Sequence, residues 1–433
     1  MDLEKLINKV LKMDVDEVSL ILEERDRRQI RYSNNRIDIS KLWLQKSLQV
    51  FLAKGKKVFS TTIWDVNKAE EMIQRYVKIL GNLPENKNFF GINPEKQSYN
   101  REKMDSSLLD MDLEWIAREV IDGAVEKGAR RVAGVIYRDH VKREIATNYN
   151  SHKEEVAGID IVVRAFNEYR NAGQEAVTTA ESRDIENPRE IGERAGSIAS
   201  MSGNPKAGKE GKFKVLFHPL GFGSLVSYSM QFASAFMIDS GMSFFADKLG
   251  KKIFSEKFTL YDDPTFFCSG HRTFDEEATA TRRTPLVEKG MVKNYLHSYS
   301  TAKKFDTTTT GNAGIIRPQP WQAVMENGSK SHEDLLNDID RGLFIVNLWY
   351  TRFQDYRNGD FSTIPRDGIF YIENGEIKES WKGIRVSDNM QRIFSSILDV
   401  SKERMKVKWW DEVLPSYLPY VLVDGVNITR STL

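Results

Sequence analysis

Ile30-Arg31-Tyr32-Ser33-Asn34-Asn35 is a short stretch of alternating apolar and polar residues that ends in two asparagines. A stretch of similar character, Ile145-Ala146-Thr147-Asn148-Tyr149-Asn150, begins 115 residues further along the chain. Alternation is typical of a half-buried strand, and asparagine tolerates the backbone conformation of a tight turn. The two stretches therefore predict a strand-to-turn unit that occurs twice.

The surroundings of the two stretches also correspond. Thr61 and Thr178 lie 117 residues apart in the last predicted strand of each copy, so the spacing is nearly preserved. Further strands are predicted at residues 18–22, 48–52 and 58–62 in the first copy and at 132–137, 159–163 and 176–179 in the second. The pattern favours a duplicated antiparallel meander. The alternative is two unrelated meanders that share common strand chemistry.

Apolar stripes at helical spacing are found on both sides of each meander. Asn187-Pro188 predicts the N-cap and first residue of the last of these helices. The stripes are Leu3, Leu6, Ile7 and Val10; Ala69, Met72, Ile73, Tyr76 and Leu80; Leu113, Ile116, Ala117 and Val120; and Ile191, Ala195 and Ile198. Helix, meander, helix, twice over, predicts an α/β layer domain with an antiparallel sheet.

A segment rich in glycine, Met201–Gly211, divides the chain. We predict an N-terminal domain at residues 1–205 and a β-rich, barrel-like domain at 206–433, and so an α+β protein. After the division we expect a strand at 214–217 and an apolar helix at 224–238. Asn374-Gly375 predicts a hairpin turn, and Ser331 predicts a helix cap.

The composition narrows the class of protein. The 63 basic and 62 acidic residues nearly cancel, which disfavours a dedicated nucleic-acid binder. A single cysteine, Cys268, can form neither an intrachain disulfide nor a zinc site rich in cysteine. The N-terminus reads as an amphipathic segment, and no run approaches the roughly 20 apolar residues that span a bilayer. We therefore expect a cytoplasmic protein without membrane contact.

Generic catalytic motifs are scarce. The chain has no phosphate-binding loop, no GxSxG and no HExxH, and its six histidines lack the spacing of metal ligands. Asp262-Asp263 and Asp275-Glu276-Glu277 are acidic clusters that could hold a cation, although solvated turns are the commoner explanation. Trp409-Trp410 is a ligand platform or, more commonly, part of a packed core.

An ordered series of motifs between about residues 214 and 430 resembles the C-terminal half of the TldD/PmbA family. The N-terminal half fits through Ser33-Asn34-Asn35-Arg36-Ile37 and the strand that follows. The motifs of the second half are Phe217-His218-Pro219-Leu220-Gly221-Phe222-Gly223, Thr284–His297, Thr309-Thr310-Gly311-Asn312-Ala313, Arg317-Pro318, Gly342-Leu343-Phe344-Ile345, Gly359-Asp360-Phe361-Ser362 and Glu373-Asn374-Gly375-Glu376-Ile377.

The resemblance implies a role in limited proteolysis. Members are linked to the maturation of peptide antibiotics and the degradation of antitoxins, and they have been called modulators of DNA gyrase. The proteolytic subunit carries an HExxxH helix and a cysteine near the C-terminus, which together bind zinc. Its PmbA-type paralogue lacks this set and pairs with it as a heterodimer.

This chain departs from the zinc motif. Where His218 aligns with the first histidine, Pro219 replaces the catalytic glutamate and Gly223 replaces the second histidine. The stretch 406–413 has no cysteine, and a lone imidazole does not supply the three protein ligands of a catalytic zinc. We therefore expect no metal and no cofactor, and a non-catalytic PmbA/TldE-like subunit of a TldD-type complex that degrades or matures unfolded peptides.

Four residues are candidates for a groove that binds an extended peptide: Gly311, Asn312, Ala313 and Arg317. A tight turn followed by a solvated arginine explains these four residues equally well.

The expected partners are a zinc-bearing paralogue or a second copy of the chain, together with a peptide substrate. Direct nucleic-acid binding is not expected. Two alternatives remain open: a peptidase with rearranged or metal-free chemistry at His271, Asp275, Glu276 or His297, and a non-enzymatic interaction protein that acts on toxin or topoisomerase systems.

Overall fold

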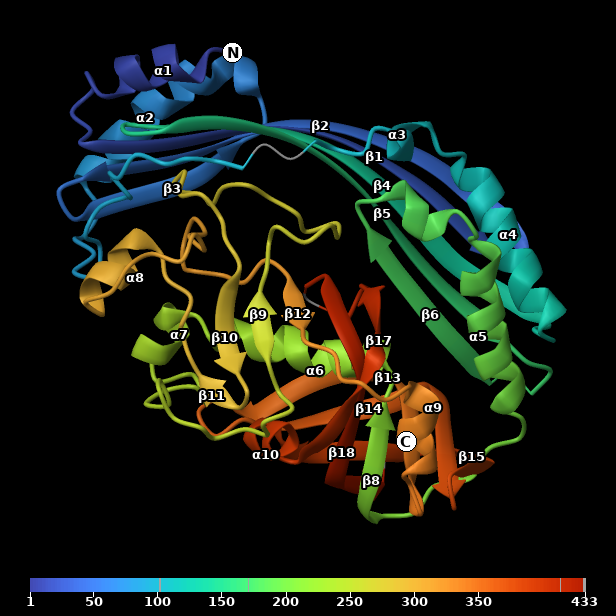
Figure 1. Cartoon of the computed structure of the whole chain (residues 1–433). Helices are drawn as coiled ribbons and strands as arrows, with labels where there is room; N and C mark the ends of the chain where they lie inside the picture. Colours follow the sequence, from blue (N-terminus) through green and yellow to red (C-terminus); the bar gives the residue numbers. More distant parts are fainter. Residues whose placement is uncertain (101–102, 170, 413, 431–433) are drawn as a thin grey trace.

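The computed structural model describes residues 1–100, 103–169, 171–412 and 414–430 (Figure 1). Two large sheets, each with its own helices, organise the molecule. The first is a six-stranded sheet in the order β3-β2-β1-β4-β5-β6. Its strands are β1 (Glu17–Ser33), β2 (Arg36–Lys54), β3 (Lys57–Ile63), β4 (Arg131–Thr147), β5 (Ser151–Phe166) and β6 (Ala172–Thr179).

The predicted duplication is confirmed by the strand order. Each copy is a meander of three antiparallel strands, and β1 pairs with β4 at the centre of the sheet, so the two copies meet along equivalent strands. The helices cover one face and leave the other turned toward the second sheet (Figure 1). They are α1 (Leu3–Val10), α2 (Ala69–Gly81), α3 (Ser107–Asp110), α4 (Leu113–Glu126) and α5 (Arg189–Met201), with short 3-10 turns at Val66–Lys68 and Ser182–Ile185.

Two predicted strands of each copy prove to be one long strand. Residues 18–22 and 30–35 both belong to β1, and 132–137 and 145–147 both belong to β4. The polar run between the apolar ends suggested a break. It stays in the sheet because its charges pair across strands: Arg27 with Asp139 at 2.7 Å and Arg143 with Glu23 at 2.9 Å.

The second sheet is built from residues 206–430 and partly closes on itself. Strands β18, β8, β13, β14 and β16 form a ring, because β16 pairs with both β14 and β18. Its strands are β7 (Lys206–Ala207), β8 (Gly211–Phe217), β9 (Leu260–Asp262), β10 (Thr284–Glu288), β11 (Met291–Val292), β12 (Ala323–Met325), β13 (Arg341–Asp355), β14 (Asp360–Glu373), β15 (Glu376–Lys382), β16 (Ile384–Asn389), β17 (Ile397–Val407) and β18 (Ser416–Arg430). The α+β class and the barrel-like character are confirmed.

The predicted apolar helix at 224–238 differs from the observed one. It is two helices, because the chain bends at Ser234, whose hydroxyl donates to the Pro318 carbonyl at 2.7 Å. The helices of this part are α6 (Pro219–Gln231), α7 (Ala235–Asp239), α8 (Tyr299–Lys304), α9 (His332–Asn337) and α10 (Met390–Ser395). Ser331 caps α9 as expected, and Asn374-Gly375, both at positive φ, turns β14 into β15.

The division of the chain at residue 205 into separate domains stays a prediction. Within the described part of the chain, no helix is both long and apolar enough to cross a membrane. The largest core cluster lies inside the second sheet around α6, where Phe217, Phe222 and Phe394 are fully buried. This core holds the segment that the sequence singled out.

Candidate functional site

The candidate site lies where β8 passes into α6. His218 is the N-cap of α6, and its Nδ1 accepts the Leu220 backbone N–H at 3.1 Å. Pro219 follows at the first helical position, where its missing N–H costs nothing. The helix is apolar on nearly every side and is correspondingly buried, with contacts to β13 and β18. The motif positions are therefore held rigidly.

His218 is enclosed by the protein and is 3% exposed. Its ring meets the edge of Tyr420 with centroids 4.9 Å apart, and its Nε2 lies 4.0 Å from Oε2 of the buried Glu175. Arg194 Nε donates to the same Glu175 oxygen at 3.0 Å. Burial lowers the pKa of His218 to about 4. The ring is therefore neutral near pH 7, and because Nδ1 accepts a hydrogen bond, its proton is on Nε2.

Gly223 lies against the side chain of Glu412. A Cβ at position 223 would lie 2.5 Å from Glu412 Oε1, closer than non-bonded atoms approach. Glu412 is 4% exposed, and burial raises its pKa well above the ordinary value, an effect that Ser416 and Lys408 offset only in part. Burial therefore favours the neutral form of Glu412, whose side chain fills the space that a longer side chain at 223 would need.

These residues do not fit a zinc ion of the HExxxH type. His218 uses Nδ1 as an acceptor and carries its proton on Nε2, while Pro219 and Gly223 offer no donor atom. The nearby carboxylate of Glu175 already binds Arg194. A catalytic zinc needs three protein ligands. His218, Pro219 and Gly223 therefore cannot hold a catalytic zinc ion.

Trp409 and Trp410, in the stretch 406–413 that contains no cysteine, are part of an aromatic cluster. Trp409 is buried, and its Nε1 donates to Ser224 Oγ at 3.4 Å, while Trp410 is 60% exposed. Both rings pack against Trp349, with centroids 5.2 and 5.4 Å away. The core interpretation therefore holds for Trp409. Val413, the last residue of that stretch, lies outside the described residues.

Gly311, Asn312 and Ala313 form a buried turn. Asn312 is 1% exposed, and its Nδ2 donates to Asp262 and to the Gln319 carbonyl. The Ala313 N–H donates to Asp275 Oδ2 at 2.9 Å. The two acidic clusters suggested as cation sites thus supply the acceptors that hold this turn. Burial raises the pKa of Asp262 to about 7 and that of Asp275 to about 6.

Arg317 lies at the wall of a cleft of about 250 Å³ between the first sheet and the helices α7 and α8. We call it the Arg317 cleft. Arg317 Nη1 contacts Met237 Sδ at 3.1 Å, and Lys304 pairs with Asp239 at 2.6 Å on the same wall. The cleft is lined on one side by β2, β3 and the segment after α2, and on the other by α7, α8 and loops. The lining includes Phe51, Phe59, Phe89, Phe236, Phe305 and Glu277. The cleft offers apolar surface with a few charges at its margin, as ligand sites usually do.

Other candidate acids and histidines are tied to structural contacts. Glu277 accepts the Tyr299 N–H at 2.9 Å, and burial raises its pKa well above the ordinary value. Glu276 lies beside it in a cavity of about 30 Å³ that adjoins the Arg317 cleft. His271 stacks on Phe267, and burial lowers the pKa of His297 to about 4. None of these contacts resembles an activated nucleophile or base.

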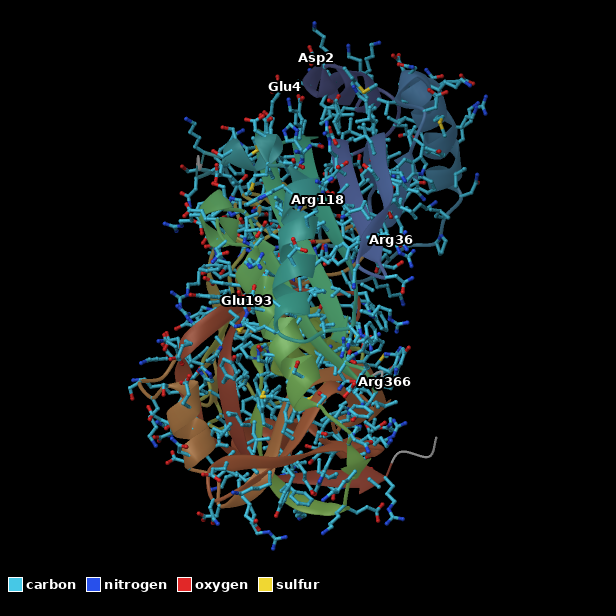
Figure 2. The ribbon with its side chains drawn as sticks, turned by 90° about the vertical axis from the view of Figure 1, so that its right-hand side faces the viewer. Asp2, Glu4, Arg36, Arg118, Glu193 and Arg366 are labelled. Atoms are coloured by element: carbon cyan, nitrogen blue, oxygen red, sulfur yellow. The ribbon has the colours of Figure 1, made fainter. Side chains whose placement is uncertain are left out.

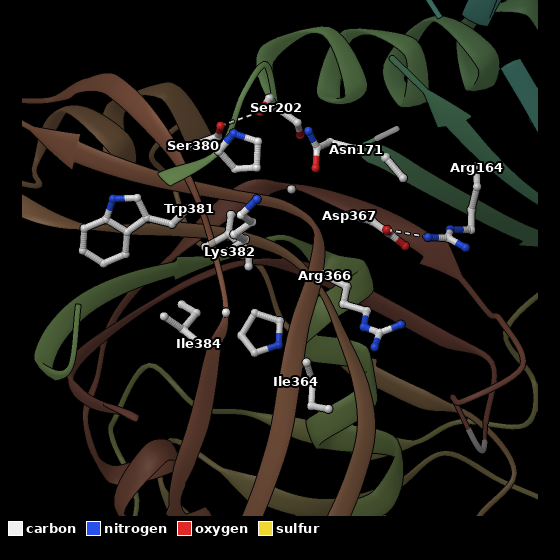
Figure 3. A pocket seen from close by; sticks show the side chains of 16 residues that line it. Arg164, Asn171, Ser202, Ile364, Arg366, Asp367, Ser380, Trp381, Lys382 and Ile384 are labelled. Carbon is white, nitrogen blue, oxygen red and sulfur yellow. Dashed lines mark hydrogen bonds and ion pairs between the residues drawn. The ribbon is translucent and has the colours of Figure 1, made fainter. Parts of the chain in front are cut away.

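A second pocket, of about 280 Å³, lies where the second sheet splits (Figure 3). Residues 360–363 of β14 pair with β16 and residues 370–373 pair with β15, so the backbone between them borders the gap. Arg164 Nη2 binds Asp367 Oδ1 at 2.7 Å at one side, and Trp381 and Ile384 form the other. No local sequence pattern predicts this pocket, because its walls come from segments that are far apart in the chain.

His332, Glu333 and Glu403 form a third group of polar side chains, next to Tyr420. His332 stacks on Tyr420 with centroids 4.6 Å apart, and its Nε2 and Nδ1 lie 3.2 and 3.8 Å from Glu333 and Glu403. In the described part of the chain these three residues have ligand atoms within 4.8 Å of one another. Each carboxylate faces a different ring nitrogen, which suits two ion pairs better than one metal ion.

Comparison with known proteins identifies the family. Residues 210–430, just over half of the chain, match the family described as PmbA/TldA metallopeptidase C-terminal domain. The chain belongs to this family. The match covers the second sheet from β8 onward and the motif segment with Glu412, whereas Glu175, Arg194 and the first-sheet side of the Arg317 cleft lie before it.

Several known proteins are similar to this chain in sequence. An uncharacterized protein of Methanocaldococcus jannaschii is 27% identical over 385 residues, which cover 87% of this chain and 89% of that protein. A metalloprotease of the same organism is 31% identical over 45% of this chain and 44% of its own length. Metalloprotease PmbA of Escherichia coli O157:H7 is 26% identical over 37% of this chain and 35% of its own. The matches to named metalloproteases thus span less than half of those proteins.

Solved structures share the fold over the whole chain. TldE from Thermococcus kodakarensis has a TM-score of 0.85 at 22% identity, covering 99% of both chains. A proposed modulator of a DNA gyrase from Thermotoga maritima has a TM-score of 0.86 at 20% identity, covering 99% of this chain and 100% of that one. The TldD/PmbA fold therefore includes the duplicated six-stranded sheet as well as the C-terminal domain.

Proposed function

We propose that this chain is the non-catalytic, PmbA/TldE-type subunit of a TldD-type zinc metalloprotease complex that degrades or matures unfolded peptides. One observation carries the proposal: at the motif position of a metallopeptidase fold, Glu412 fills the space at Gly223, and His218 has no free nitrogen lone pair. The scaffold is intact, whereas the groups that would hold and activate a zinc-bound water are absent from the motif.

A subunit without a catalytic zinc site can still contribute to the complex by binding the substrate. The Arg317 cleft is lined by aromatic side chains and is open to solvent at Ile316, which is 83% exposed. Apolar side chains of an unfolded peptide suit this surface, because their burial stabilises the complex by about 25 cal/mol per Å² of apolar area. Folded proteins bury these side chains, so the cleft favours unfolded chains.

The test compares the chain alone with a mixture. The full chain is purified alone and together with a relative that carries HExxxH, and each sample is assayed for zinc content and for cleavage of an unfolded protein. We expect zinc and chelator-sensitive cleavage with the relative present, and neither with the chain alone. Chelator-sensitive cleavage by the chain alone would overturn the proposal.

The cleft is tested separately in the active mixture. Arg317→Ala should raise KM for an unfolded substrate several-fold and leave the association of the two chains unchanged. Arg118→Ala is the matched control, since Arg118 on α4 is 70% exposed and lies outside the cleft. An equal effect of both variants would remove the cleft from the proposal.

A further inference from the structure

The pocket where the second sheet splits is built into the backbone, and we call it the split-sheet pocket. β14 pairs with β16 as far as Thr363 and with β15 from Phe370 onward. Between these points Pro365 has no N–H to donate, and the opposite chain turns away at Gly383, whose φ is 73°. On its other side this stretch of β14 pairs with β13. The backbone groups of residues 364–369 that face the pocket therefore have no strand partner among the described residues.

A bulge in β14 shapes one wall of the split-sheet pocket. The register of β13 and β14 shifts so that Asp367 and Gly368 together stand opposite Val346. Asp367 has a φ of 56°, which is unfavourable for a residue other than glycine. Bulges and residues in such conformations are common beside binding sites, where they redirect side chains. The backbone of β14 here is therefore that of a ligand site rather than that of a regular strand.

The described side chains that line the pocket carry an excess of positive charge. The charged ones are Arg164, Arg366, Lys382 and Asp367. Arg164 of β5 binds Asp367 at 2.7 Å, near the junction of the two sheets, where Arg366 also lies (Figure 2). Arg366 stands over the ring of Trp349 at 5.2 Å. Neither Arg366 nor Lys382 has a carboxylate within ion-pair distance in the described part of the chain. Two cations without counter-ions favour an anionic ligand.

Apolar side chains form much of the rest of the split-sheet pocket. Trp381 and Ile384 border it on one side. Ile364 and Pro365 border it on the side of β14. The volume of about 280 Å³ is near the lower end of small-molecule sites, which run from roughly 300 to 1,000 Å³. An inorganic anion would leave the apolar sides unused. The ligand that fits is therefore a carboxylate attached to a small apolar group.

We propose that the split-sheet pocket binds the C-terminal residue of a peptide. Its α-carboxylate is held by Arg366 and Lys382, which lie on opposite sides of the gap (Figure 3). Its apolar side chain packs against Trp381 and Ile384. Charge-assisted hydrogen bonds to a carboxylate are among the strongest that side chains form. The last amide of the peptide lies beside the unpaired backbone groups of residues 364–369, and backbone groups are a common means of capturing a chain end.

The inference rests on the proposed function only for the source of the peptide, since binding is measured on the full chain alone. Isothermal titration calorimetry compares acetyl-Ala-Leu, which has a free carboxylate, with acetyl-Ala-Leu-amide. We expect the free acid to bind about tenfold more tightly, because the amide loses the hydrogen bonds to a charged group. 4-Methylpentanoate carries the same apolar group and carboxylate without the peptide bond, and it should bind more weakly than acetyl-Ala-Leu. Equal affinity of these two acids would make a free carboxylic acid the ligand and overturn the peptide assignment.

The position of the carboxylate is tested by variants. Lys382→Met and Arg366→Met should each weaken the binding of acetyl-Ala-Leu about tenfold and leave that of the amide unchanged. Lys378→Met is the matched control, since Lys378 is on the same strand, pairs with Glu376 and lies outside the pocket. Thermal unfolding verifies that each variant is folded. No binding of the free acid, equal affinities for acid and amide, or wild-type affinity in both pocket variants would overturn the inference. None of these results bears on whether the mixture with an HExxxH relative cleaves protein.

Discussion

Glu412 shows what a single residue does to the candidate site. Its carboxyl group lies against the backbone of α6 at Gly223, and among the described residues only the Ser416 hydroxyl and the charge of Lys408 act in favour of its ionised form. Burial outweighs both, since a buried charge with so little compensation is costly. The site is therefore held by a group whose ionisation would disrupt it.

The stability of the Glu412→Gln variant relative to the wild type should therefore change with pH. The folded pKa of Glu412 is raised, so the stability that depends on its proton is complete below the unfolded pKa of about 4.3 and is lost as pH rises through the folded pKa. Glutamine keeps the shape without the ionisation. The midpoint of thermal unfolding of the variant should match the wild type near pH 4 and exceed it increasingly toward pH 9.

Glu376→Gln is the control for this measurement. Glu376 is 73% exposed at its side chain and pairs with Lys378 on β15, so its replacement should change the midpoint little at any pH. A difference between Glu412→Gln and the wild type that does not vary with pH would show that Glu412 is ionised in the folded protein.

At the scale of elements, the covering of the first sheet depends on the close packing of α4 and α5. Gly192 and Gly196 of α5 face the backbone of α4, and a Cβ at Gly192 would lie 1.9 Å from the Val120 carbonyl oxygen. No side chain fits at this distance, so glycine there allows the two helices to touch.

Gly192→Ala should therefore destabilise the protein by about 2 kcal/mol, as overpacking of a core does. Gly81→Ala is the matched change on α2, where nothing lies within 4 Å of the added methyl group. It should stabilise by about 0.5 kcal/mol, because alanine is the better helix former. Urea unfolding of both variants measures the two effects, and a Gly192→Ala protein as stable as the wild type would contradict the packing argument.

Turns and helix caps could be predicted from the sequence, because residues close by in the chain determine them. The turns at Asn34-Asn35 and Asn374-Gly375 and the cap at Ser331 depend on side chains next to the backbone that they stabilise. The polar middle of β1 was not predictable, because its charges are paired by β4, more than 100 residues away. Likewise, no pattern near Gly223 reveals that Glu412, in a distant segment, faces it.

At the scale of the whole molecule, partly buried ion pairs connect the first sheet and the segment after β6 to the second sheet. Lys408, just after β17, binds Asp160 of β5 at 2.8 Å, and Lys406 binds Glu181 at 2.7 Å and Asp184 at 2.6 Å. Burial raises the pKa of Asp160, but the charge of Lys408 and hydrogen bonds outweigh it, so the pKa lies below its ordinary value. Asp160 therefore contributes stability that is lost as pH falls.

Lys408→Met should cost about 3 kcal/mol, since it leaves Asp160 buried without its counter-ion. Asp160→Asn/Lys408→Met removes both charges and should recover most of this loss. Chemical denaturation at pH 7 compares the single and double variants. The 2.8 Å contact indicates that Asp160 and Lys408 are energetically coupled. A double variant no more stable than Lys408→Met would contradict this coupling.

The position of β18 matters for how the protein is made. This strand lies about 200 residues after β8 in the chain and is central in the second sheet, where it pairs with β8, β12, β16 and β17. Chains are synthesised from the N-terminus at about 5–20 residues per second, and domains generally fold as units. The first sheet can form early, but β8 and α6 must wait for β18 before their apolar surface is covered. The nascent chain is therefore exposed to aggregation and proteolysis while the residues between α6 and β18 are synthesised.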